Sequence, residues 1–327
     1  MSTFPARRPR RLRTTPQMRN LVAETEVRPS DLILPMFIVD GLDAPREIPS
    51  MPGVYQHTFD SLRRAAEEAL EAGVPCIDLF GVPLDEDKDE SGSVAWDPQG
   101  ILNRGISCLH EEFGDDLIIM ADTCLDEFTS HGHCGVLDDK GRVLNDESVK
   151  LYQDMARSQA RAGAQIVSPS GMMDGQVAAI RADLDEAGHE DVAIMAYSAK
   201  YASAFFGPFR DAVGSSLEGD RRTYQQDPRN FRESLLEAEL DIEEGADFVM
   251  VKPGLPYLDV LSAVAETSPV PVAVYQVSGE YAMVKAAAAN GWIDGEAIML
   301  ESLTAFKRAG AGQILTYFAT EAARLLK

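Results

Sequence analysis

Short apolar segments alternate with amphipathic segments along the chain from about residue 31 to the C-terminus. The apolar segments are bounded by turn residues, which is typical of strands that are buried on both faces. Eight such strands are expected, at residues 32–39, 75–82, 117–125, 164–168, 192–198, 247–251, 271–277 and 313–318.

The amphipathic segments between these strands predict helices. The helices are expected at residues 58–72, 98–113, 147–162, 175–187, 228–244, 257–266, 280–290 and 296–308. Several of them are followed by a glycine suited to the left-handed conformation that ends a helix. These glycines are Gly73, Gly163, Gly188, Gly245, Gly291 and Gly310.

Eight strands joined by helices within one continuous segment predict an α/β fold, a (β/α)8 TIM barrel. A doubly wound open sheet is the alternative, but no G-x-G-x-x-G motif follows the first strand. We expect residues 31–327 to form a single barrel. Residues 1–30 precede it as an extended arm, in which arginines cluster and prolines break any helix. Such an arm can contact a neighbouring subunit or remain a solvated tail.

The chain carries 53 acidic and 30 basic residues among 327, for a formal net charge of −23. This charge repels nucleic acid and anionic membranes. The acidic excess is spread over the whole chain, which favours adaptation to a high-salt cytosol over an ordinary acidic surface. No apolar run reaches the ~18 residues that span a membrane. The N-terminus lacks a secretory signal, and four scattered cysteines suit no disulfide framework, so we expect a cytoplasmic, halophilic protein.

In a barrel of this kind the chemistry lies at the carboxyl ends of the strands. Lys252 follows the strand at 247–251, and Lys200 follows the neighbouring strand at 192–198. Two nearby ammonium groups disfavour each other's charge, and a free amine attacks a carbonyl carbon to form a Schiff base. A solvated lysine at a strand end is the alternative. Two lysines on adjacent strands, in a chain with only eight, favour a reactive pair.

A polar loop with the sequence DTCLDEFTSHGHCG follows the third strand, at residues 122–135. Two thiolates and a carboxylate, from Cys124, Cys134 and Asp126, can converge on a borderline-soft cation such as Zn²⁺. They leave an open position for water or substrate, as a catalytic metal site requires. Two free cysteines on a polar loop are the alternative.

The ends of the predicted strands carry motifs that resemble a known family. The motifs are DTCLDEFTSHGHCG (122–135), SPSGMMDGQ (168–176), AYSAK (196–200), FGPFR (206–210), DRRTYQ (220–225), MVKPG (250–254) and YQVSGEYAM (275–283). In this order they are similar to the motifs of porphobilinogen synthase, also called 5-aminolevulinate dehydratase. The resemblance runs from about Arg13 to the C-terminus.

The resemblance implies a barrel whose arm embraces a neighbour within a homo-octamer. It implies a lyase of tetrapyrrole and haem synthesis that condenses two 5-aminolevulinate molecules to porphobilinogen with loss of two waters. By motif, Lys252 forms a Schiff base with the first substrate (the P site) and Lys200 with the second (the A site). The other site residues implied are Ser278 and Tyr317 in the P site and Asp122, Ser170, Arg210, Arg221 and Gln225 in the A site.

The metal loop departs from the family pattern. Zinc-dependent members carry three cysteines in this loop, and members without zinc carry acidic residues and lack the cysteines. Cys124, Asp126 and Cys134 form a hybrid. Because a carboxylate is a harder ligand than a thiolate, zinc should bind more weakly here than at three thiolates, with Mn²⁺ or Mg²⁺ better tolerated. We expect a catalytic zinc. Some members also hold an allosteric Mg²⁺ at the position of Glu237, which is otherwise a solvated helix residue.

Two other functions fit part of the sequence. A class I Schiff-base aldolase would account for Lys252, but not for Lys200, the cysteine-containing loop or the paired arginines. A catalytically inactive barrel that serves as an oligomeric scaffold would not need the intact set of reactive residues.

Overall fold

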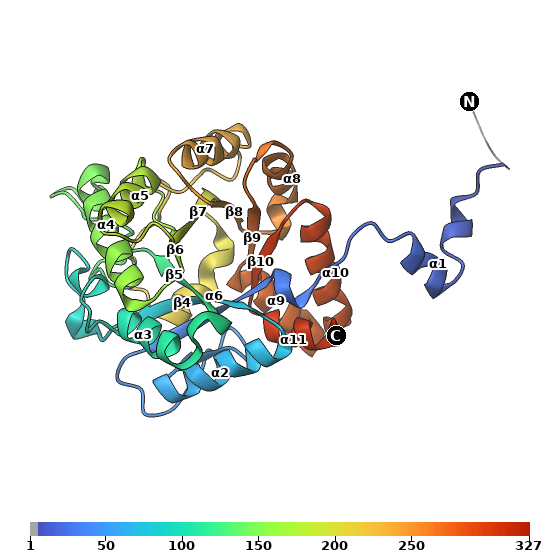
Figure 1. The fold of residues 1–327 in the computed structure, drawn as a ribbon, viewed down its shortest axis with the longest axis horizontal. Helices are drawn as coiled ribbons and strands as arrows, with labels where there is room; N and C mark the ends of the chain where they lie inside the picture. Colours follow the sequence, from blue (N-terminus) through green and yellow to red (C-terminus); the bar gives the residue numbers. More distant parts are fainter. Residues whose placement is uncertain (1–5) are drawn as a thin grey trace.

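Eight parallel strands form a closed barrel in the computed structural model, which describes residues 6–327 (Figure 1). The strands are β1 (Leu32–Val39), β4 (Cys76–Val82), β5 (Ile118–Thr123), β6 (Ile166–Pro169), β7 (Ala193–Lys200), β8 (Phe248–Lys252), β9 (Val272–Gln276) and β10 (Gln313–Thr316). The barrel closes between β1 and β10, where Leu32 pairs with Ile314. The predicted (β/α)8 barrel is therefore confirmed.

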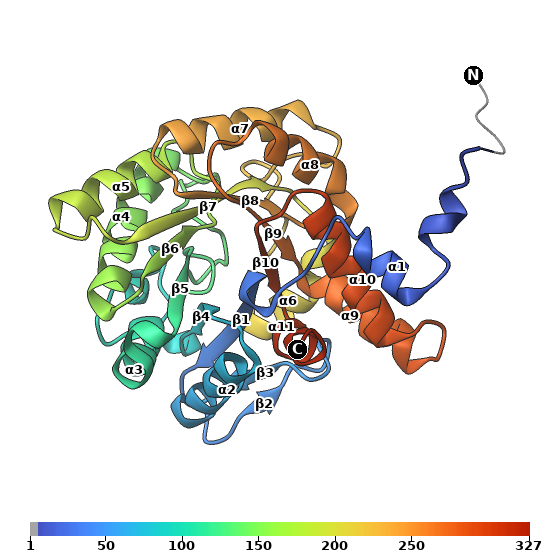
Figure 2. The same ribbon diagram turned by 45° about the vertical axis from the view of Figure 1, so that its right-hand side comes forward.

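Helices surround the barrel on its outside (Figures 1 and 2). They are α2 (Phe59–Ala72), α3 (Ile101–Phe113), α4 (Asn145–Ala162), α5 (Gln176–Glu186), α7 (Arg232–Glu243), α8 (Leu258–Thr267), α9 (Ser278–Ala289), α10 (Gly295–Arg308) and α11 (Ala319–Leu325). Gly73 and Gly163 follow α2 and α4 with positive φ angles of 99° and 109°. Residues with a side chain rarely adopt this conformation, so these glycines end the helices as predicted.

Helix α3 packs tightly on the barrel because two glycines leave room for it. A Cβ atom added to Gly81 of β4 would lie 2.5 Å from Cβ of Leu102. A Cβ atom added to Gly105 of α3 would lie 3.1 Å from Cγ2 of Ile38 on β1. A side chain at residue 81 would therefore push α3 away from the strands that it covers.

Two short strands and two short α-helices within residues 31–327 were not predicted from the sequence. Strands β2 (Arg46–Glu47) and β3 (Tyr55–His57) form an antiparallel pair in the long loop after β1, and β3 also pairs with β1. Helix α6 (Gly207–Val213) lies in the loop after β7, and α11 follows β10. Each is too short for its hydrophobic period to be recognised.

The N-terminal arm runs away from the barrel (Figures 1 and 2). Its first five residues lie outside the described part of the chain. The expectation that prolines break any helix in the arm is wrong at Pro16, which opens α1 (Pro16–Leu21). Proline is tolerated there because the first turn needs no intrahelical N–H bond, and the Thr15 side chain caps the helix by accepting from the Met18 N–H.

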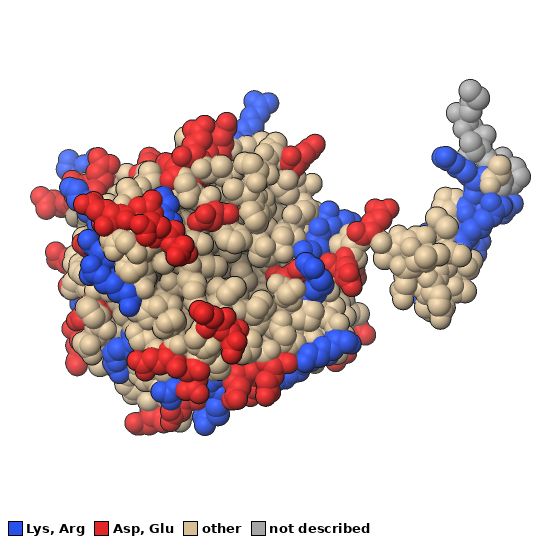
Figure 3. Space-filling view, viewed as in Figure 1, with Lys and Arg blue, Asp and Glu red and all other residues tan. Residues whose placement is uncertain are grey.

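Charge is distributed unevenly between the arm and the barrel. Basic side chains gather on the outer part of the arm, whereas acidic side chains are spread over the visible face of the barrel (Figure 3). Neither α1 nor the preceding 3-10 helix (Pro9–Leu12) contains a buried residue. Between residues 6 and 327, no helix combines the length and the apolar character needed to cross a membrane.

Candidate active site

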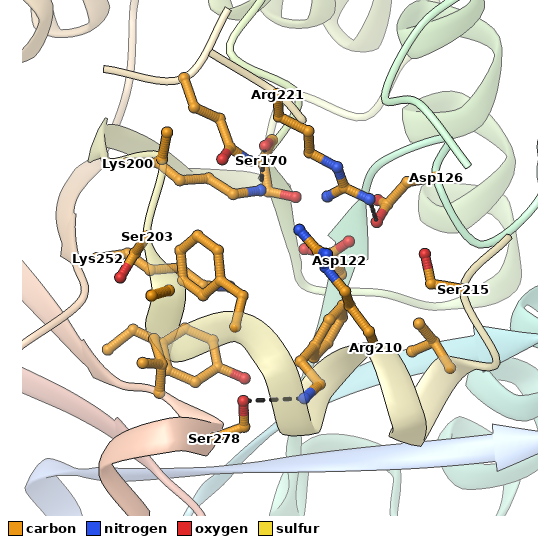
Figure 4. A pocket seen from close by; sticks show the side chains of 18 of the residues that line it. Asp122, Asp126, Ser170, Lys200, Ser203, Arg210, Ser215, Arg221, Lys252 and Ser278 are labelled. Carbon is orange, nitrogen blue, oxygen red and sulfur yellow. Dashed lines mark hydrogen bonds and ion pairs between the residues drawn. The ribbon is translucent and has the colours of Figure 1, made fainter. Parts of the chain in front are cut away.

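A cavity of about 220 Å³ lies at the carboxyl ends of the barrel strands. It brings together every residue that the sequence assigned to catalysis or substrate binding. These residues are Asp122, Ser170, Lys200, Arg210, Arg221, Gln225, Lys252, Ser278 and Tyr317. Figure 4 shows Lys200, Asp122 and Arg210 directed toward a common space.

The two lysines are the last residues of neighbouring strands. Lys200 of β7 pairs in register with Lys252 of β8, after an irregularity in β7 between Ala196 and Ala199. Both lysine side chains are buried. Because facing residues on adjacent strands project side chains to the same face, both amines reach the cavity.

Lys252 lies among aromatic rings. Its Nζ atom is 4.1 Å from the ring centre of Tyr275 and 4.8 Å from that of Tyr197. Burial lowers the pKa of Lys252 to about 8, and the ammonium of Lys200 acts in the same direction. Lys252 therefore has a free amine available near neutral pH, as a nucleophile requires.

Lys200 has a different environment. Its Nζ atom donates to the carbonyl oxygen of Ser170 at 2.5 Å. Burial acts to lower the pKa of Lys200, but its electrostatic interactions with Cys124, Cys134 and two aspartates raise it above its ordinary value. The expected mutual lowering of the two pKa values thus holds for Lys252 and not for Lys200.

Asp122 is the second-to-last residue of β5, and it interacts electrostatically with both lysines. Its side chain is buried, and its Oδ1 atom has no hydrogen-bond partner among the described residues. Burial raises the pKa of Asp122 to about 6, although the positive charges of Lys200 and Lys252 act to lower it. A carboxyl group with a pKa near neutral and a free oxygen is suited to exchange a proton with a ligand.

A segment that we call the lid (residues 203–226) lines the cavity and carries Arg210, Arg221 and Gln225. Arg221 donates from Nη2 to Asp126 Oδ2 at 2.6 Å and to the Gly132 carbonyl oxygen at 2.9 Å. Figure 4 shows this ion pair at the side of the cavity. One lid arginine is thus bound to the metal loop, while Arg210 points into the cavity.

Cys124, Asp126 and Cys134 form a buried cluster whose potential ligand atoms all lie within 4.8 Å of one another. The two cysteines are free thiols. The Tyr152 hydroxyl lies 3.5 Å from Cys124 Sγ and donates to the Cys134 carbonyl oxygen at 2.8 Å. The Tyr152 hydroxyl helps to orient the potential ligands from outside the cluster. Two sulfur ligands and one carboxylate fit a borderline-soft divalent cation.

Ser278 and Tyr317 lie on the other side of the cavity. Ser278 begins α9, and its Oγ accepts from the Phe209 N–H of α6 at 3.0 Å. The hydroxyls of Tyr317 and Tyr275 lie 3.2 Å apart. These contacts hold two hydroxyl groups near the amine of Lys252, where they can bind an anionic group.

Glu237 lies on α7, in the outer helix layer, and does not line the cavity. Its side chain is half-buried. Burial raises its pKa to about 7, and the charges of Asp174, Glu233 and Glu244 act in the same direction. Within residues 6–327, Glu237 belongs to no cluster of three potential ligands.

A comparison with known protein families agrees with the arrangement of residues around the two lysines. A family model described as delta-aminolevulinic acid dehydratase matches residues 6–325. The chain belongs to the delta-aminolevulinic acid dehydratase family. This confirms the resemblance drawn from the motifs at the strand ends.

Individual dehydratases are similar over nearly the whole chain. A delta-aminolevulinic acid dehydratase of Mycobacterium tuberculosis is 64% identical over 323 residues, which cover 99% of this chain and 98% of that protein. One from Streptomyces coelicolor is 62% identical over 325 residues, with the same coverage. The solved structure of the Toxoplasma gondii dehydratase, in complex with the reaction product porphobilinogen, matches with a TM-score of 0.95 at 48% identity, covering 98% of this chain and 91% of that one.

Sequence reasoning missed three buried acidic residues near this dehydratase cavity. Asp78 lies inside β4 and accepts from the Tyr197 hydroxyl at 3.1 Å. Glu127 lines the cavity, and Glu280 lies in the first turn of α9. Asp78 could have been found, because an aspartate within the apolar strand CIDLFGV is unusual. The partners of the other two cannot be read from the sequence.

Proposed function

We propose that this chain is a hydro-lyase that condenses two molecules of 5-aminolevulinate to porphobilinogen with loss of two waters, in tetrapyrrole and haem synthesis. The observation that carries this proposal is the pair of buried lysines that end adjacent strands in register at one cavity. Two carbonyl substrates can be held there as Schiff bases next to each other. Holding both reactants replaces a bimolecular encounter by a reaction within one site.

Lys252 holds the first substrate, in the P site. Its lowered pKa leaves the amine free to attack the ketone carbon, and one water leaves as the imine forms. The hydroxyls of Ser278 and Tyr317 bind the carboxylate of this substrate. The surrounding aromatic rings exclude water, which protects the imine from hydrolysis.

Lys200 holds the second substrate, in the A site. Arg210, Gln225 and Arg221 bind its carboxylate, because the planar guanidinium matches a carboxylate with two parallel hydrogen bonds. For this role Arg221 has to exchange its bond with Asp126 for a bond with the substrate.

Two further groups complete the A site in this proposal. Ser170 contributes to the pocket beside Lys200, and its carbonyl oxygen already accepts a hydrogen bond from the Lys200 amine. Asp122 contacts the amino group of the substrate and accepts a proton during carbon–carbon bond formation. Its pKa of about 6 supports this role, because both of its protonation states are accessible near neutral pH.

Cys124, Asp126 and Cys134 hold a catalytic zinc in this proposal. When bound, zinc supplies a Lewis acid for a water or a substrate amine. The support is the chemistry of the buried donor set. Glu237 is proposed as the site of an allosteric magnesium ion, because the charges of three acidic residues act on its carboxyl group and a cation would offset them.

The assembly and its environment are also part of the proposal. The arm exposes its residues away from its own barrel, which supports its role as the contact between subunits of a homo-octamer. Residues 31–327 then act as the single catalytic barrel. The net charge of −23 supports function in a high-salt cytoplasm.

Borohydride reduction tests the proposed function, because it converts an imine to a stable amine. Protein mixed with 5-aminolevulinate and borohydride should carry the label on Lys252 and Lys200, located by peptide mass analysis. A class I aldolase would instead be labelled by a sugar phosphate and not by 5-aminolevulinate. An inactive scaffold would be labelled by neither.

A further inference from the structure

A buried carboxylate connects the two segments that form the P site. Glu280 lies in the first turn of α9 and is 0% exposed. Its Oε1 atom accepts from the Leu255 N–H at 2.6 Å, and its Oε2 atom accepts from Gly254 at 3.1 Å and from Val277 at 2.8 Å. A single carboxylate thus binds three main-chain N–H groups from two different loops.

The two loops carry Lys252 and Ser278. Gly254 and Leu255 follow Lys252 after one intervening residue, and Val277 directly precedes Ser278. Strands β8 and β9 pair from Val249–Val272 to Val251–Val274 and no further. Beyond that point the strand pairing no longer fixes the two loops relative to each other. The hydrogen bonds of Glu280 connect the two loops just beyond the last paired residues of these strands.

The main chain around these bonds is closely packed. A Cβ atom added to Gly254 would lie 2.6 Å from the ring of Phe306 on α10. A Cβ atom added to Gly279 would lie 2.4 Å from the carbonyl oxygen of Phe205 in the lid. The loops therefore fit between α10 and the lid, and a small shift of either loop moves the side chain that it carries.

The charge of Glu280 is compensated mainly by main-chain groups. Burial raises its pKa to about 7, and the groups that oppose this effect are the N–H groups of Leu255, Val277 and Gly254. A buried carboxylate is costly unless its oxygens are hydrogen-bonded. An exposed polar side chain at the start of α9 would cap the helix at lower cost, so capping alone does not account for a fully buried glutamate.

We propose that Glu280 is a positioning residue of the P site, which holds the amine of Lys252 and the hydroxyl of Ser278 at the separation that the first substrate requires. This inference rests on the proposed function. Glu280 itself does not touch the substrate. Because a misplacement of about 1 Å can cost about 100-fold in rate, loss of these bonds should slow imine formation at Lys252 selectively.

The test compares imine formation at the two lysines within one molecule. In Glu280→Gln the amide –NH₂ cannot accept a hydrogen bond, so at least one of the three bonds is lost. Wild-type protein and this variant are mixed with 5-aminolevulinate and borohydride, and labelling of Lys252 and Lys200 is followed by peptide mass analysis. The matched control is Glu296→Gln, which changes an exposed glutamate in the first turn of α10.

We expect Glu280→Gln to reduce the rate of labelling at Lys252 at least tenfold relative to Lys200, whereas Glu296→Gln leaves the ratio unchanged. Equal slowing at both lysines, or an unchanged ratio, would overturn the positioning role. Should Glu280→Gln not fold, Glu280→Asp gives the same readout, because its shorter carboxylate cannot reach both loops. Wild-type protein that is labelled at neither lysine would instead overturn the proposed function.

Discussion

Replacing Lys200 with methionine should raise the pKa of Lys252. Burial of Lys252 is the larger cause of its low pKa of about 8, and the Lys200 ammonium is the second. Methionine removes the charge of Lys200 but fills a similar volume, so the burial of Lys252 is kept. With one of the two causes removed, the amine of Lys252 becomes harder to deprotonate.

The size of the effect follows from the charges involved. Two ammonium groups that face one cavity repel each other by an energy on the order of 2 kcal/mol at an effective dielectric constant of about 20. This energy corresponds to about one to two pKa units. At pH 7, an amine with a pKa of 8 is free in about one molecule in ten, whereas an ordinary lysine is free in about one in three thousand. Imine formation at Lys252 should therefore fall by about 10-fold or more at pH 7.

The assay is the initial rate of borohydride trapping at Lys252, measured by peptide mass analysis from about pH 6 to about pH 10. Because only the free amine reacts, the rate should rise with pH through a midpoint near 8 in the wild-type protein, and through a higher midpoint in Lys200→Met. The control is Lys200→Arg, which keeps the positive charge but cannot form an imine at neutral pH. Equal midpoints in Lys200→Met and Lys200→Arg would show that the charge of Lys200 does not lower the pKa of Lys252.

Three further predictions concern the metal loop and the surface charge. Replacing Arg221 with methionine leaves Asp126 buried without its partner and should lower the free energy of unfolding of metal-free protein by about 3–5 kcal/mol in urea titrations; an unchanged value would show that the ion pair contributes nothing. A strong chelator should abolish porphobilinogen formation and added zinc should restore it, so full activity in chelator would rule out a catalytic metal. Raising KCl from about 0.1 M to about 2 M should increase the melting temperature, because salt screens the repulsion of the acidic surface; full stability without salt would contradict this.

The barrel could be predicted because the sequence features that mark its strands and helices are local. Apolar strands, amphipathic helices and glycines such as Gly73 repeat along the chain, and each marks an element without reference to distant residues. The strand-end rule then placed Lys200 and Lys252 at one face, since the ends of parallel strands meet there. Lys200 and Lys252 pair with each other at the ends of adjacent strands, which is where this rule places reactive side chains.

Other parts of the site depend on residues that are far apart in the sequence. The ion pair between Arg221 and Asp126 joins positions separated by 95 residues. The bonds of Glu280 go to main-chain N–H groups, which leave no trace in the sequence. Which lysine has the lowered pKa depends on its surroundings, aromatic rings for Lys252 and thiols with carboxylates for Lys200. Sequence reasoning placed the reactive groups but could not assign their electrostatics.

The proposed role of Lys252 is tested most directly by porphobilinogen formation in purified wild-type protein and in the Lys252→Ala variant. Both proteins are incubated with 5-aminolevulinate, zinc and KCl, and the product is measured colorimetrically. We expect the wild-type protein to form porphobilinogen, whereas Lys252→Ala, while folded, forms none. Product formation by Lys252→Ala at the wild-type rate would contradict the central role of this lysine.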